Sequence, residues 1–207
     1  MPRNRRPVPK EQKQDELLAA AVELFLTDGY DATSMSRIAE HAGVTANTLY
    51  WYFRNKDELL LAVADLHMHA LLSEHASLGD RPLADQLAWL VNRLRPFKHL
   101  IATVHDRLSV SDAISAWHTD FHQTVEQLFE RQLPGPIPTE RRAAEAAAAT
   151  YALEGAITHN LDDTTSQQLC QLIAERLHHA AVANPPTDAP PASAHATRRR
   201  HITTPNA

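Results

Sequence analysis

The chain has 207 residues, of which 43% are hydrophobic and 22% charged, so it can bury a sizeable core and suits one or two domains. No apolar stretch approaches membrane-spanning length, and no apolar segment follows the basic N-terminus as in a signal peptide, so we expect a cytoplasmic protein without a membrane partner. Five glycines, long segments with helical periodicity and a single cysteine, Cys170, favour an all-α fold without an intramolecular disulfide.

The formal net charge of −5 is unevenly distributed. Residues 1–56 contain eight Lys and Arg against seven Asp and Glu, whereas the rest of the chain contains twelve against eighteen. Arg3, Arg5, Arg6 and Lys10 all precede the first acidic residue. We expect this segment to be a flexible arm that reaches DNA phosphates or a minor groove, and the alternative is a solvated tail without a binding role.

A helix over residues 11–27 follows the arm. Its apolar residues recur at helical spacing, which predicts one stripe packed against a core. The stripe consists of Leu17, Leu18, Ala21, Val22 and Phe25.

Two short helices around a glycine turn come next. Ser34 can cap the first, over residues 35–41, with its hydroxyl, and Gly43 tolerates the positive φ that such a turn often requires. Thr45 is a suitable cap for the second, over residues 46–53. The pair is typical of a helix-turn-helix, in which the second helix reads DNA.

The second helix of the pair is unusually rich in aromatic residues. Leu49 and Phe53 lie four apart and face inward. Tyr50, Trp51 and Tyr52 must then spread across the other faces, where a core alone would not require three consecutive aromatics. We expect the short polar side chains at the start of this helix to approach base edges, and the phenol and indole donors to reach phosphates.

Residues 33–59 resemble the DNA-binding domain of the TetR family of transcriptional regulators. The family pattern is Thr-Ser/Thr, three spacers, Ile-Ala, two spacers, Ala-Gly-Val-Ser/Thr, then Leu-Tyr, one spacer, an aromatic, Phe and Lys-Asp/Glu-x-Leu, and this sequence supplies every element at the expected spacing. The resemblance implies a homodimeric repressor that binds a palindromic operator and is released by a small-molecule effector. A dimeric DNA-binding protein without an effector is the alternative.

The DNA contacts expected within this segment come from both short helices and from the residue that opens the next helix. Capping or ordinary solvation is the alternative for the threonines and the asparagine, and an ordinary surface lysine is the alternative for Lys56. The expected contacts are Ser34, Ser36, Arg37, Thr45, Ala46, Asn47, Thr48, Tyr50, Trp51, Tyr52 and Lys56.

About six more helices are expected after the head, which makes about nine in total. They comprise a long linking helix over residues 56–77, a helix opened by Arg81-Pro82 and broken at Pro96, a short helix over 97–107, one that starts at Asp112, an alanine-rich helix over 140–159 capped by Thr139, and a last helix from Thr165 or Ser166. The predicted organisation is a basic arm (1–10), a DNA-binding domain (11–56), an effector-binding and dimerisation domain (57–182) and a disordered Pro-rich tail (183–207).

Aromatic and histidine side chains of the second domain are candidates for lining an effector cavity. Plain core packing is the alternative for the apolar members. The candidates are Trp89, Phe97, His105, Trp117, Phe121 and Tyr151.

Thirteen histidines raise the question of a metal site. His118 and His122 are four apart on one helix and can chelate a divalent ion, as in a metal-dependent enzyme. No His-Glu-x-x-His motif is present, and two ligands are too few without a third from elsewhere. We therefore expect these two residues to line a pocket or a solvated face, with no metal, cofactor or catalytic activity. His67 is expected on the surface.

The last two helices are expected to form the dimer interface, as they commonly do in the family. The small residues allow close helix approach, and the apolar stripe exceeds what a free surface needs; the alternative is that Gly155 faces the subunit's own core. The expected interface residues are Ala152, Gly155, Ala156, Leu169, Leu172, Ile173 and Leu177.

Overall fold

The structure is a computed structural model that describes residues 9–133, 135 and 137–180. Within them the chain forms helices and no strand, which confirms the all-α prediction. The Pro-rich tail and residues 1–8 of the expected arm lie outside the described residues. The helices are α1 (Lys10–Thr27), α2 (Met35–His41), α3 (Ala46–Tyr52), α4 (Lys56–Ala76), α5 (Leu83–Leu94), the 3₁₀ helix η1 (Arg95–Phe97), α6 (Lys98–Arg107), α7 (Asp112–Gln132), α8 (Thr139–Thr158) and α9 (Asp163–His179).

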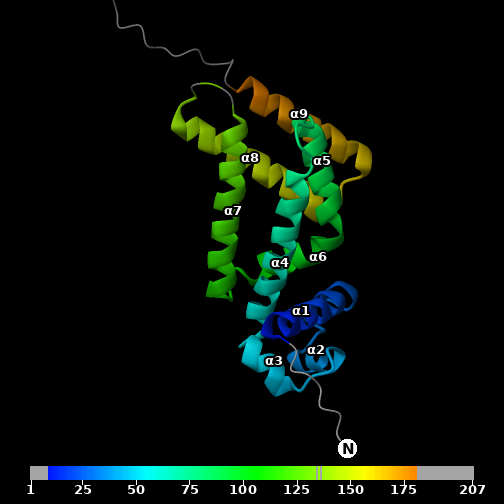
Figure 1. Ribbon diagram of the computed structural model, residues 1–207. Coiled ribbons are helices and arrows are strands. Elements are labelled where there is room, and N and C mark those ends of the chain that lie inside the picture. The colour runs from blue at the N-terminus through cyan, green and yellow to red at the C-terminus, as the bar shows by residue number, and fades with distance from the viewer. Residues whose placement is uncertain (1–8, 134, 136, 181–207) are drawn as a thin grey trace, which may run out of the picture.

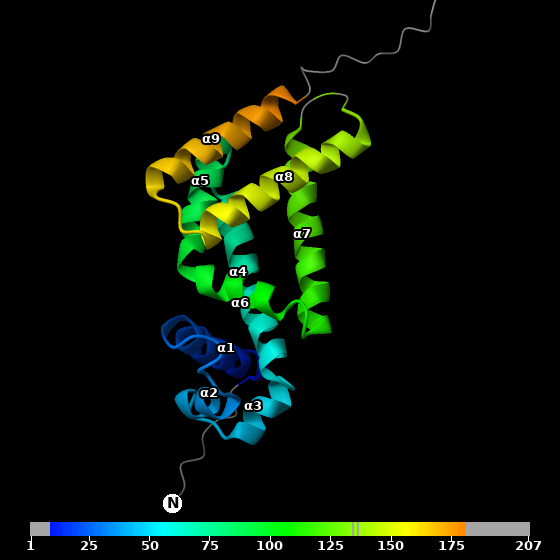
Figure 2. The ribbon, with the colours of Figure 1, turned by 180° about the vertical axis from the view of Figure 1, so that it is seen from behind.

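The molecule is elongated, with α1, α2 and α3 at one end and α8 and α9 at the other (Figure 1). Helix α4 starts beside the first group, here called the head, and runs into the remaining helices, here called the body. The view from behind shows the same arrangement, with α6 close to the head and α7 alongside (Figure 2). Helix α4 therefore belongs to both parts.

Side-chain caps fix several helix starts. The Ser34 hydroxyl accepts from Arg37 N at 3.2 Å, and the Thr45 hydroxyl accepts from Thr48 N at 3.2 Å, as the sequence predicted. Helix α9 begins earlier than expected, at Asp163, because the Asp162 carboxylate accepts from Thr165 N at 3.0 Å. Thr139 is not a cap, since it is already the first residue of α8 and makes no side-chain cap bond.

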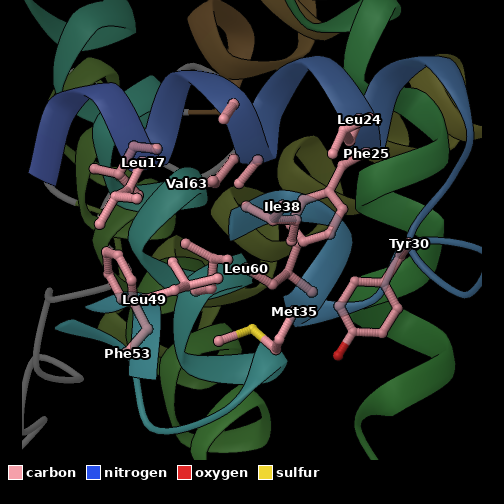
Figure 3. Packing of buried hydrophobic residues seen from close by; sticks show 14 of the residues in the cluster. Leu17, Leu24, Phe25, Tyr30, Met35, Ile38, Leu49, Phe53, Leu60 and Val63 are labelled. Carbon is pink, nitrogen blue, oxygen red and sulfur yellow. The ribbon is translucent and has the colours of Figure 1, made fainter. Parts of the chain in front are cut away.

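The head has a continuous apolar core, in which side chains from α1, α2, α3 and α4 converge (Figure 3). Ile38 and Leu49 are fully buried, as is Leu17. The same cluster includes Val104 of α6 and Ile114 of α7. Apolar packing thus continues from the head into the body, so their relative position is fixed by burial as well as by chain connectivity.

A second core joins α5, the end of α7, α8 and α9. The alanines of α8 lie in it and allow close helix approach. Three residues expected at the dimer interface are buried here instead: Ala156 and Leu177 are each 1% exposed, and Ile173 is 6% exposed. A residue with almost no exposed area in one subunit has none to bury against a second. Their apolar character is explained by this core, so we remove them from the proposed interface.

A polar cluster centred on Asp57 connects the two parts, and we call it the Asp57 clamp. Arg107 of α6 donates from Nε and Nη2 to the two carboxylate oxygens of Asp57 at 2.7 and 2.8 Å, and the Tyr30 hydroxyl donates to the same carboxylate. Lys56 Nζ donates to the carbonyls of Tyr30 at 2.8 Å and Thr33 at 3.1 Å. The clamp therefore ties the α1–α2 loop, the first turn of α4 and the last turn of α6 together.

Charge and burial oppose each other at Asp57. Burial alone would raise the pKa of Asp57, but hydrogen bonds from Arg107, Tyr30 and Ser111 outweigh burial and hold that pKa below its usual range. Burial and the hydrogen bond to Asp57 raise the pKa of Tyr30, so its phenol stays a donor at neutral pH. The carboxylate is ionised in the folded protein and is fully used as an acceptor.

We expect Arg107→Ala to lower the free energy of unfolding by about 1–3 kcal/mol, because a largely buried charged acceptor loses its two strongest donors. Urea denaturation followed by circular dichroism measures this. Arg93→Ala is the matched control, since Arg93 makes an equally bidentate pair with Glu74, at 2.7 and 2.8 Å, on an exposed surface. A loss as large in the control would contradict a special role for the clamp.

The clamp also predicts a pH dependence. Because the folded-state pKa of Asp57 is lowered, its carboxylate stabilises the fold above the unfolded value of about 3.9, and this contribution is lost as the pH falls through the folded pKa. The difference in unfolding free energy between the wild type and Asp57→Asn should therefore be greatest near neutral pH and shrink below about pH 4. Chemical denaturation over this range measures it, and a constant difference would contradict the assignment.

Candidate nucleic-acid interface

Helix α3 presents one polar and aromatic face to solvent. Leu49 is 0% and Phe53 is 3% exposed, so the opposite face is anchored in the head core. This anchoring turns Asn47, Tyr50 and Trp51 outward, and the two aromatics are 49% and 67% exposed. Large aromatics this exposed contribute little to the core, so a binding surface explains them better than packing does.

The turn before α3 is tightly bonded. Gly43 has a φ of 65°, in the left-handed region that glycine adopts without strain. Val44 N donates to Ala39 O at 2.9 Å, which closes the turn. The Thr45 hydroxyl caps α3, and the Thr48 hydroxyl lies 2.9 Å from it, whereas the half-buried Ala46 packs against the head core.

Helix α2 contributes a second edge of this surface. Ser34, which caps α2, and Ser36 in its first turn are both exposed. Arg37 is also exposed, but its guanidinium pairs with Asp28 at 2.6 Å. A contact from Arg37 to DNA would have to replace this ion pair, so Arg37 is a weaker candidate than the sequence indicated.

An open depression with mixed polar and apolar lining lies between α2, the end of α3 and the start of α4. Its lining includes Ser36, Tyr50, Arg54, Asn55 and Lys56. Burial lowers the pKa of Lys56, and its ammonium is held by two backbone carbonyls, so its main contacts are within the protein. Arg54 is the more exposed cation here, and sequence reasoning missed it, although a basic residue directly after the helix was a usable signal.

The first turn of α1 lies beside α3. Lys10 Nζ is 4.9 Å from the centre of the Trp51 ring, and the Trp51 and Tyr52 rings meet edge to face at 4.8 Å. The described chain therefore begins at the edge of the exposed α3 face. Lys10, which was expected in the flexible arm, is the first residue of α1.

Four of the six expected effector residues gather in the body around His118 and His122 of α7. His105 of α6 lies 3.1 Å from His118 between the Nε2 atoms, and the Tyr151 ring lies 5.3 Å from that of His122. Trp117 and Phe121 stack in parallel beside them at 5.4 Å. Sequence reasoning missed Glu154 of α8, which lies 2.8 Å from His105 Nε2.

The other two expected effector residues lie apart from this group. Trp89 has its ring contact with His75 at 6.0 Å, and Phe97 with His67 at 4.4 Å. The expectation that His67 is a surface residue is wrong, because it is partly buried and its Nε2 atom has no hydrogen-bond partner within the described residues. Burial lowers the pKa of His67, which favours the neutral ring.

Four expected dimer residues remain available on α8 and α9. Leu172 is 61% exposed, while Leu169, Ala152 and Gly155 are partly exposed. A Cβ placed on Gly155 would meet nothing within 4 Å, so this glycine faces open space rather than the subunit's core. Across the part of the chain that the structure describes, no helix is long and apolar enough to span a membrane.

Comparison with known proteins identifies this arrangement. Residues 17–63 match the family model for bacterial regulatory proteins of the tetR family. The transcriptional activator FasR of Mycolicibacterium smegmatis is 43% identical over 66 residues, which cover 32% of this chain and 30% of FasR. The transcriptional repressor ComR of Escherichia coli is 28% identical over 147 residues, which cover 63% of this chain and 70% of ComR.

The fold extends the likeness beyond the head. A crystal structure of a transcriptional regulator from Rhodococcus sp. RHA1 superposes with a TM-score of 0.67 at 19% identity, covering 83% of this chain and 99% of that one. The family match lies on α1 to α4, where the exposed α3 face and its glycine turn were found. The chain therefore belongs to the TetR family, with the DNA-binding domain of that family at residues 17–63.

Proposed function

We propose that two copies of this chain bind a palindromic operator, with α3 of each subunit in a major groove. The observation that carries the proposal is the outward face of Asn47, Tyr50 and Trp51 on a helix whose other face is anchored in the core. A rigidly held helix of this kind can present side chains to base edges, and two-fold symmetry matches two half-sites. The serines of α2 and Arg54 flank the helix and are suited to phosphate contacts.

The proposed outcome of binding is repression that a small-molecule effector relieves. An effector would act by favouring a head orientation that no longer fits the operator. A contact path supports this: α6 carries His105, which faces the cluster around His118, and two residues later Arg107, which holds Asp57 in the head. The relatives include an activator and a repressor, so the direction of regulation has to be tested. A promoter reporter in cells that lack the protein measures it, and repression predicts that transcription rises.

Asn47→Ala and Tyr50→Ala should each weaken specific operator binding by about 1–3 kcal/mol, which is roughly 5- to 150-fold, with helicity unchanged. Fluorescence anisotropy at fixed salt with operator and scrambled duplexes measures this. Asn92→Ala, at an exposed site on α5, is the control for Asn47 and should bind as the wild type does. Wild-type affinity in the combined Asn47 and Tyr50 variant would show that α3 does not read DNA.

Gly155→Leu should dissociate the dimer without destabilising the subunit. A Cβ at Gly155 meets no atom of its own subunit within 4 Å, and leucine has a higher helix propensity than glycine, so the substitution should be tolerated within the subunit. If α8 packs closely against its counterpart in a second subunit, the leucine of each subunit would push the two helices apart. Sedimentation velocity measures the loss of dimer, and Ala116→Leu, on the exposed part of α7, is the control. A fully dimeric Gly155→Leu protein would place the interface elsewhere.

A further inference from the structure

Four ligand-type side chains from three helices converge in the body. They are His105 of α6, His118 and His122 of α7, and Glu154 of α8, and one nitrogen or oxygen atom from each lies within 4.8 Å of all the others. We propose that these four residues form a binding site for a divalent transition-metal ion of the zinc class. The sequence revealed only the pair on α7, because the other two ligands come from separate helices.

The separations within the cluster are close to those of a tetrahedral site, and none exceeds 4.8 Å. With zinc–ligand bonds of about 2.0–2.1 Å, neighbouring ligand atoms in a tetrahedron lie roughly 3.3 Å apart. The separations are 2.8 Å from His105 Nε2 to Glu154 Oε1, 3.1 Å from His105 Nε2 to His118 Nε2, and 3.6 Å from His122 Nε2 to Glu154 Oε2. Small side-chain rotations would bring the ligand atoms around one ion.

Hydrogen bonds within the cluster do not satisfy it. His105 Nε2 contacts both Glu154 and His118 Nε2, but an imidazole nitrogen that donates its one hydrogen to the carboxylate cannot also accept from His118. His122 is only 7% exposed, and neither of its ring nitrogens has a hydrogen-bond partner within the described residues. Buried polar atoms are normally paired, so the unpaired Nε2 atom of His122 is suited to bind an ion.

The type of ligand atom selects the ion. Imidazole nitrogens suit Zn²⁺, Cu²⁺ and Ni²⁺, whereas Mg²⁺ and Ca²⁺ prefer sets made of oxygen atoms. The single Glu154 carboxylate offsets part of the charge of a divalent ion. The Phe121 and Tyr151 rings lie 5.6 and 5.3 Å from the His122 ring, and Trp117 stacks on Phe121, so aromatic side chains border the cluster. The alternative, a polar lining of an organic effector pocket, does not explain why three imidazoles and one carboxylate converge so closely.

Direct metal binding to the full untagged chain tests the proposal. After treatment with a chelator, the protein is titrated with Zn²⁺ by calorimetry and with Co²⁺ by visible absorption, which reports coordination geometry. We expect one ion per chain, tetrahedral Co²⁺ bands and no binding of Mg²⁺. The measurement contains no DNA, so its outcome is independent of the proposed operator binding.

Variants locate the ion. His118→Gln and Glu154→Gln should each weaken Zn²⁺ binding by at least about 10-fold and abolish the tetrahedral Co²⁺ spectrum, because even outer residues of metal sites change affinity by 10- to 100-fold. Circular dichroism confirms that the variants fold, and both positions are less buried than His122. His99→Gln, at an exposed position of α6, and His178→Gln with His179→Gln, at exposed positions of α9, are the controls and should bind normally.

Two results would overturn the site. The first is an absence of saturable Zn²⁺ or Co²⁺ binding to the wild type. The second is equal affinity in the wild type, His118→Gln and Glu154→Gln, or a loss that occurs only in the His178 and His179 control, since the ion would then be bound elsewhere.

Discussion

The bidentate ion pair between Asp57 and Arg107 is the constraint on which the arrangement of this molecule depends. It lies where the α1–α2 loop, α4 and α6 meet, and Tyr30 donates to the same carboxylate. Apolar packing from Val104 and Ile114 holds the two parts together, but packing is non-directional, whereas a bidentate pair fixes an orientation. The head therefore has a defined direction relative to the body.

The head could be predicted in detail because its signals are local. Caps at Ser34 and Thr45 lie within three residues of the amides they satisfy, and the glycine turn is encoded at one position. The polar contacts of these residues were less predictable. Arg37 and Lys56 carry the right charge for DNA, yet their partners, Asp28 and two loop carbonyls, are brought close only by folding.

The body was harder to predict than the head, because its arrangement depends on contacts between residues that are distant in the sequence. An apolar stripe on α9 predicts that one face is buried, but not whether a neighbouring helix or a second subunit covers it. Ile173 and Leu177 pack into their own subunit, while Leu172 remains exposed. The histidine cluster could not be predicted for the same reason. His105 and Glu154 approach α7 from other helices, and no local sequence pattern encodes the positions of those helices.

The exposed face of α3 has an evolutionary consequence. Asn47, Tyr50 and Trp51 contribute little to the head core, and substitutions at such surface positions usually change stability by less than about 0.5 kcal/mol. The anchors Leu49 and Phe53 carry the folding requirement separately. Under the proposed operator contacts, sequence preference can therefore change by substitution on one side of this helix while the other side maintains the fold, which gives duplicated copies of such a gene a short route to new operators.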